Sequence, residues 1–145
     1  MSARPSLPML QQAAKTSEFR QMHEAFRASG GIVGCEEVVA SLSRFTCQPI
    51  SRLARWIVDG DILPLQWQGI MMLPLFQFDR TWIAPDPCVA PVIRELLPVL
   101  QEWDACLWFA QPNPWLAHAL PVEMVRRDPT AVLQAARAAR PIAIA

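Results

Sequence analysis

The side chains that could carry out a reaction are few in this chain, and they lie far apart. Neither histidine stands in a recognisable catalytic context with a carboxylate and a nucleophile, so no hydrolytic or acyl-transfer set is legible. Five scattered glycines form no phosphate-binding or dinucleotide-binding pattern. We therefore expect no enzymatic activity and no cofactor.

The cysteines could in principle hold a metal ion, but their spacing argues against it. Structural zinc sites use closely spaced ligand pairs such as C-x-x-C, and this chain has none. The sequence therefore predicts reduced thiols and no metal centre. The four residues are Cys35, Cys47, Cys88 and Cys106.

Binding chemistry is better represented, because the C-terminal third is rich in tryptophan and arginine, the residue types that dominate protein interfaces. We assign Trp108, Phe109 and Leu116 to the core, and Trp115 and His118 to an exposed turn as contact candidates. Four arginines nearby give a basic edge that could meet an acidic partner, the alternative being ordinary surface charge. They are Arg126, Arg127, Arg137 and Arg140.

A second candidate site lies in the middle of the chain. Two short helices, over residues 34–42 and from Pro49 to Val58, have the size of a helix-turn-helix. Residues 35–80 hold four arginines and five acidic groups, a net charge of −1 (4 − 5), whereas DNA-binding modules usually have a basic face. Operator binding and a non-binding scaffold both stay open. The DNA-contact candidates are Gln48, Ser51, Arg52 and Arg55, with Arg44 placed for a phosphate.

The composition limits the class of protein. With 52% hydrophobic and 18% charged residues the chain lies outside the disordered class. This hydrophobic content exceeds what a small monomer buries, so we expect a partner to cover some of the apolar surface. Thirteen basic and thirteen acidic side chains cancel, so no global field attracts nucleic acid or membrane. Apolar runs break within about ten residues and no signal-peptide pattern is present, so we expect a cytoplasmic protein without a membrane span.

The elements that position these sites are predicted to be mainly helical. Phe19, Met22 and Phe26 form the apolar stripe of an N-terminal helix, which we interpret as a docking or homodimerisation arm. Two apolar runs around Gln68–Gly69 predict a β-hairpin, and Pro98 should kink or divide a helix that follows. The expected divisions are an arm over 1–30, a helix-turn-helix and hairpin module over 31–80, and a multi-helix domain over 81–145.

The C-terminal pattern resembles the toxin-binding domain of the Xre/MbcA/ParS antitoxins of bacterial type II toxin–antitoxin pairs. In that family a W-F-x-x-P-N-x-x-L-x-x-x-x-P core precedes P-x-x-V-x-x-A-A. A glycine that often follows the leucine, where the turn needs a positive φ, is replaced here by Ala117, His118 or Ala119. The matching residues are Trp108, Phe109, Pro112, Asn113, Leu116, Pro121, Pro129, Val132, Ala135 and Ala136. The preceding helix, turn, helix, hairpin order resembles a small MerR-like or excisionase-like winged helix.

The resemblance implies an antitoxin that neutralises a RES-type, NAD-consuming toxin by direct binding, with repression of its own operon as a second role. In related antitoxins the C-terminal helix and chain end lie across the toxin's cleft, which assigns Arg140, Ile142 and Ile144 to that contact. Two other classes remain open. One is a stand-alone DNA-binding regulator whose C-terminal domain dimerises, and the other is a non-catalytic structural adaptor.

Overall fold

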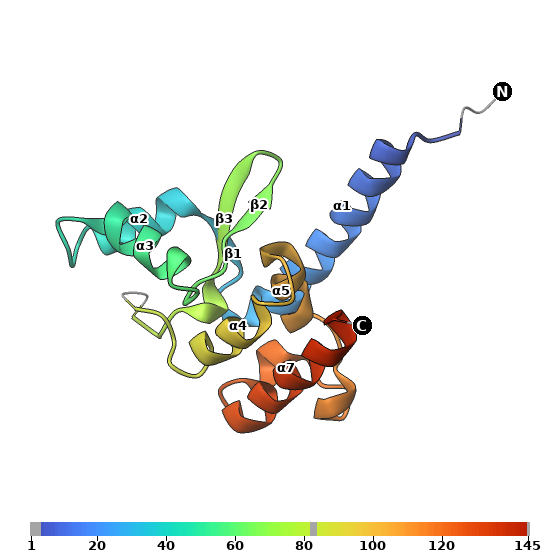
Figure 1. Cartoon of the computed structure of the whole chain (residues 1–145). Coiled ribbons are helices and arrows are strands. Elements are labelled where there is room, and N and C mark those ends of the chain that lie inside the picture. The colour runs from blue at the N-terminus through green and yellow to red at the C-terminus, as the bar shows by residue number, and fades with distance from the viewer. Residues whose placement is uncertain (1–3, 82–83, 145) are drawn as a thin grey trace.

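The computed structural model describes residues 4–81 and 84–144, with side chains up to residue 139, and it is mainly helical with one small sheet (Figure 1). The α-helices are α1 (Leu7–Phe26), α2 (Cys35–Leu42), α3 (Pro49–Val58), α4 (Ala90–Leu96), α5 (Glu102–Phe109), α6 (Pro121–Met124) and α7 (Pro129–Ile144). The strands are β1 (Ile32–Gly34), β2 (Leu65–Trp67) and β3 (Ile70–Pro74), and short 3-10 turns are η1 (Arg27–Ser29), η2 (Leu75–Gln77) and η3 (Pro114–Leu116).

Prolines set many of the helix boundaries, as the sequence predicts. The first turns of α3 and α6 begin at Pro49 and Pro121, because proline loses nothing where the backbone N–H has no helical partner. The predicted helix around Pro98 is divided, with α4 ending at Leu96 and α5 starting at Glu102. The result is a set of compact helical pieces.

The sheet is antiparallel, with strand order β1-β3-β2. The predicted hairpin is confirmed: β2 and β3 pair in register from Leu65 opposite Met72 to Trp67 opposite Ile70. Its turn residues Gln68 and Gly69 both have positive φ, 51° and 78°, as a tight two-residue hairpin requires. β1 is an additional strand that the sequence patterns did not indicate.

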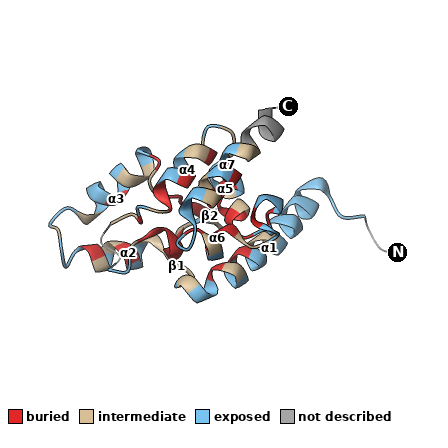
Figure 2. Ribbon diagram, turned by 90° about the horizontal axis from the view of Figure 1, so that it is seen from below, coloured by how far each residue is buried: buried red, intermediate tan, exposed pale blue. Residues whose placement is uncertain are grey.

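Two clusters of buried side chains form the core. Figure 2 shows where the buried residues lie along the ribbon. The larger joins the last turns of α1, through the fully buried Met22 and Phe26, to α4, α5, α6 and α7. The smaller lies between α2, α3 and β3. The N-terminal helix is therefore an integral part of the C-terminal helical core.

The segment 75–78 lies between these clusters and contributes to both. Phe76 belongs to the larger cluster, whereas Leu75 and Phe78 belong to the smaller. Between them Gln77 is fully buried, and its amide forms two hydrogen bonds with the backbone of Leu63: Leu63 N donates to Oε1 over 2.6 Å, and Nε2 donates to Leu63 O over 2.9 Å. This segment fixes α2, α3 and the sheet against the C-terminal helices.

Candidate functional site

The candidate contact surface is the turn between α5 and α6, and Asn113 holds that turn together. Its buried side chain accepts a hydrogen bond from Trp115 N (2.9 Å), and its backbone N–H donates to Ala119 O (3.1 Å). The carbonyl of Asn113 also accepts hydrogen bonds from the backbone of Leu116 and His118, both at 2.9 Å. Satisfying its polar groups in this way gives the loop one defined shape.

The backbone of this turn is left-handed at two consecutive residues. Ala117 has φ 54° and His118 has φ 65°. Residues with a Cβ adopt this region rarely, at a cost of about 1 to 2 kcal/mol for an alanine. The family resemblance implies a positive φ in this stretch, usually supplied by glycine, and here two non-glycine residues adopt it.

The turn directs Trp115 outward. Its side chain is 69% exposed, whereas Leu116 beside it is buried in the larger cluster. Trp115 borders a hollow of about 350 Å³ that has mainly apolar walls. The hollow is lined by Leu100, Trp108, Asn113, Pro114, Trp115, Ala135, Ala138 and Ala139. An exposed indole at the edge of an apolar hollow is suited to binding an apolar group of another protein.

The arginines of the predicted basic edge have different surroundings in the structure. The guanidinium of Arg126 is engaged inside the chain, donating to Asp86 Oδ2 (2.9 Å) and to the carbonyls of Phe76 (2.8 Å) and Phe78 (3.0 Å). Arg137 lies 3.9 Å from Glu95 of α4, on the side of α7 away from the alanines of the hollow. Arg127 is exposed between α6 and α7. Only part of the predicted edge is thus available to a partner.

The remaining predicted contacts with the toxin lie at the end of α7. The backbone of that helix extends to Ile144. The side chains of Arg140, Ile142 and Ile144 fall outside the described residues, so their role stays a prediction.

The DNA-contact candidates lie on α3 and in the connection that precedes it. Arg44 and Gln48 lie in the connection between α2 and α3, and the other three lie on α3 itself. All five side chains are exposed. They are Arg44, Gln48, Ser51, Arg52 and Arg55.

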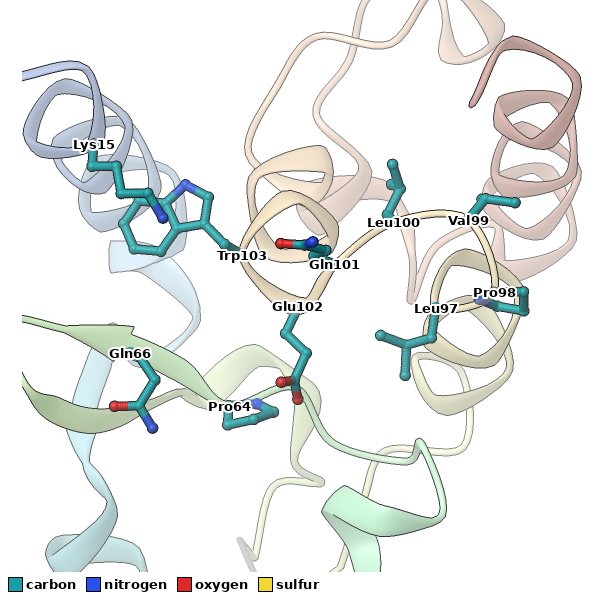
Figure 3. A pocket seen from close by; sticks show the side chains of 10 residues that line it. All are labelled: Lys15, Pro64, Gln66, Leu97, Pro98, Val99, Leu100, Gln101, Glu102 and Trp103. Atoms are coloured by element: carbon teal, nitrogen blue, oxygen red, sulfur yellow. The ribbon is translucent and has the colours of Figure 1, made fainter. Parts of the chain in front are cut away.

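A more polar hollow of about 610 Å³ lies between α1, β2 and the connection from α4 to α5 (Figure 3). Lys15 Nζ lies 4.5 Å above the ring of Trp103, whose Nε1 donates to Glu18 over 3.1 Å. Trp103 also stacks on Trp67 at 6.0 Å between centroids. Because Lys15, Glu18 and Trp67 all contact Trp103 from within the chain, we interpret this region as the seam that joins α1 to α5.

Metal and thiol chemistry find no support among the described residues. No group of three histidine, cysteine or acidic side chains converges there. All four cysteines carry free thiols, and burial raises the pKa of Cys35 and of the fully buried Cys106, which disfavours the reactive thiolate. Within the described ranges, every helix is too short or too polar to traverse a lipid bilayer.

Comparisons with protein-family models, with curated proteins and with solved structures found no match.

Sequence reasoning missed two features of these surfaces. It did not indicate that Ala135, Ala138 and Ala139 would face Trp115, although their i, i+3, i+4 spacing marks one face of a helix. It also assigned no role to the groove between α2 and α3, because the exposure of Ile50 depends on how those helices pack.

Proposed function

We propose that this chain is an antitoxin of the Xre/MbcA/ParS-like type, which neutralises a RES-type, NAD-consuming toxin by binding it through the C-terminal helical domain. The main observation in support is the position of Trp115, 69% exposed beside the apolar hollow formed with α7. A tryptophan held outward by a fully hydrogen-bonded turn loses little conformational freedom on binding, which favours its use as an interface anchor.

The surroundings of Trp115 support a protein partner. His118 is exposed in the same turn as Trp115, so the apolar centre has a polar group near it. Interfaces commonly combine an aromatic core with a polar rim, and arginine is enriched in them. The resemblance supplies the class of toxin, and the predicted contacts of Arg140, Ile142 and Ile144 would extend the same surface along α7.

Co-expression tests the proposal. The protein encoded beside this chain should arrest growth and lower cellular NAD when produced alone, and both effects should disappear when the two are produced together. Trp115→Ala should weaken the complex about 30-fold, the loss typical of an interface anchor. The matched control is Phe45→Ala, because Phe45 is also an exposed aromatic residue, at 60%, but lies in the turn between α2 and α3. A neighbour that is harmless, or one that binds Trp115→Ala as tightly as wild type, would count against an antitoxin acting through this surface.

A second candidate function, sequence-specific DNA binding, is supported by the order of elements. The succession β1, α2, α3, β2, β3 with sheet order β1-β3-β2 resembles a winged helix whose wing is the turn at Gln68–Gly69. In such modules the second helix of the helix-turn-helix enters the major groove, and the candidates on α3 are exposed as that requires.

Binding to the DNA upstream of the chain's own gene tests this second function. Arg52→Ala with Arg55→Ala should reduce affinity for the operator sequence at least tenfold, because arginine reads guanine edges in the major groove. Arg44→Ala should flatten the dependence of affinity on salt concentration, because the loss of a phosphate contact means that fewer counterions are released. Arg20→Ala on the exposed side of α1 is the control and should leave DNA binding unchanged. A chain that binds toxin but no DNA would leave the module as a scaffold.

A further inference from the structure

The first two turns of α1 extend beyond the body of the protein (Figure 1). The helix is held only toward its C-terminal half, where Met22 and Phe26 are fully buried. Every residue from position 7 to 14 is exposed (Figure 2). At 1.5 Å per residue this projecting segment is about 12 Å long. We call residues 7–14 the arm.

The arm is apolar, but its apolar side chains do not face the body. Leu7 is 68%, Met9 63% and Leu10 52% exposed. With 100° between successive helical residues, Met9 and Leu10 point roughly 120 to 140° away from Met22 around the helix axis. The chain's own core cannot cover both sides of α1. A short helix without tertiary contacts is marginal in water, so the arm needs a surface from another molecule.

The structure contains a groove of matching chemistry. It runs between α2 and α3, has a volume of about 550 Å³, and has almost entirely apolar walls that include Val39, Leu53, Ala54, Ile57 and Met71. Ile50 at its edge is 69% exposed. An amphipathic helix that places residues i and i+3 in such a groove is a common mode of recognition.

Charge also matches between the segment before the arm and the rim of the groove. The arm itself carries no charge, and Arg4, three residues before it, is basic. The groove is bordered by Glu36, and a hollow that adjoins it adds Glu37. Opposite charges at the rim set orientation and partner choice more than raw affinity.

The arm cannot reach this groove within one molecule. In Figure 1 the N-terminal end of α1 and the α2–α3 pair lie on opposite sides of the body, and α1 points away from the pair. We propose that the arm of one molecule docks in the α2–α3 groove of a second copy, and that the second copy's arm occupies the first molecule's groove. Because the arm and the groove lie at opposite ends of the body, the two molecules of such a two-fold dimer lie antiparallel and side by side, and the exchange covers both unpartnered surfaces at once.

The docked arm leaves Arg55 of α3 accessible. Arg55 points roughly 160° away from Ile57, which lines the groove, because the two residues are two positions apart at 100° per residue. The proposed dimer uses neither Trp115 nor the hollow beside it, so its test is independent of the proposed antitoxin function.

The test is the molar mass of the full chain in solution, measured by light scattering and sedimentation over a range of concentrations. Wild type should be a dimer. An arm variant, Leu7→Ser with Leu10→Ser, and a groove variant, Ile50→Gln with Ala54→Gln, should each raise the dimer dissociation constant at least tenfold. Val58→Gln is the control, because Val58 is 83% exposed on α3 but does not line the groove, and it should remain dimeric.

A mixture of the arm variant and the groove variant gives a further test. Each mixed pair keeps one unaltered arm and one unaltered groove, so the two variants should associate with each other more tightly than either does with itself. Charge reversal should behave in the same way: Glu36→Lys should weaken the dimer, and Arg4→Glu in the same chain should restore it.

Three outcomes would overturn the proposal. A wild type that stays monomeric at 100-fold above its cellular concentration rules out the dimer. A groove variant that dimerises normally while the arm variant does not would show arm-to-arm pairing. Binding of the monomer to vesicles of anionic lipid that is lost in the arm variant alone would assign the arm to a membrane surface.

Discussion

The guanidinium of Arg126 lies against the carboxylate of Asp86, with Nε donating to Oδ2 over 2.9 Å. The same guanidinium donates through Nη2 to the carbonyls of Phe76 and Phe78. Asp86 is largely buried, and its other carboxylate oxygen accepts a hydrogen bond from Cys88 N over 2.7 Å. Arg126 thus binds the C-terminal helices to the segment that separates the two clusters of the core.

Replacing Arg126 should therefore lower stability more than replacing its neighbour. Arg126→Ala removes three charge-assisted hydrogen bonds and leaves a buried carboxylate short of a partner, so the free energy of unfolding should fall by about 2 kcal/mol, allowing for the 44% exposure of the arginine side chain. Arg127→Ala removes an equal charge from an exposed site and should change it by less than about 0.5 kcal/mol. Urea denaturation measures both, and equal losses would contradict the structural role of Arg126.

The buried amide of Gln77 gives a second prediction. Gln77→Leu preserves size but leaves Leu63 N–H and C=O without partners in the core, which should destabilise the protein by about 2 to 4 kcal/mol. Gln66→Leu, at an exposed position of β2, should have a small effect. Thermal melts of the two variants would show the contrast. Similar melting temperatures would mean that water or backbone movement replaces the amide.

The left-handed turn gives a third prediction, of opposite sign. Ala117→Gly relieves the cost of φ 54° but gives the unfolded chain more freedom, so a net stabilisation of about 0.5 to 1 kcal/mol is expected. Ala138→Gly, inside α7, should instead destabilise by about 1 kcal/mol. A melting temperature that falls in Ala117→Gly would show that the turn is not strained. If the proposed antitoxin role holds, toxin affinity should change little, because Trp115 keeps its hydrogen bond to Asn113.

Glu102 gives a prediction of how the stability of the protein depends on pH. Burial raises the pKa of its carboxyl, so the folded protein holds that proton more tightly than the unfolded chain does. Ionising Glu102 in the folded protein therefore lowers the free energy of unfolding. This loss is absent below the unfolded pKa of about 4.3, grows as pH rises toward the folded pKa, and is complete above it. Glu102→Gln should therefore be more stable than wild type at pH 7 by up to about 0.5 kcal/mol, and equal to it near pH 3.5. A gain in stability that is equal at pH 7 and at pH 3.5 would mean that hydrogen bonds of the new amide cause it.

Local patterns in the sequence predicted the elements that depend on nearby residues. The stripe of Phe19, Met22 and Phe26, the hairpin turn at Gln68 and the helix break at Pro98 follow from spacing within one segment, and the structure has all three. The exposure of Trp115 also followed from the prolines around it. These features need no knowledge of distant neighbours.

Features that depend on contacts between residues far apart in the sequence could not be predicted from local patterns. Strand β1 is three residues long, too short for an alternating pattern, and it forms because Val33 meets Leu73. Arg126 was predicted as a surface contact because its partner Asp86 is 40 positions away and nothing local marks the pair. The meeting of α1 with the C-terminal helices is of the same kind.

That meeting also governs how the protein is made. The large core needs Met22 and Phe26 together with Val132, Ala135 and Ala136 of α7. About 80 residues separate Met22 from α5, the helix that packs against α1, so at roughly 5 to 20 residues per second the stripe on α1 waits about 4 to 16 s during synthesis. Until translation has passed α5, the nascent chain displays unburied phenylalanine and methionine. During that interval the nascent chain is vulnerable to proteases and to aggregation.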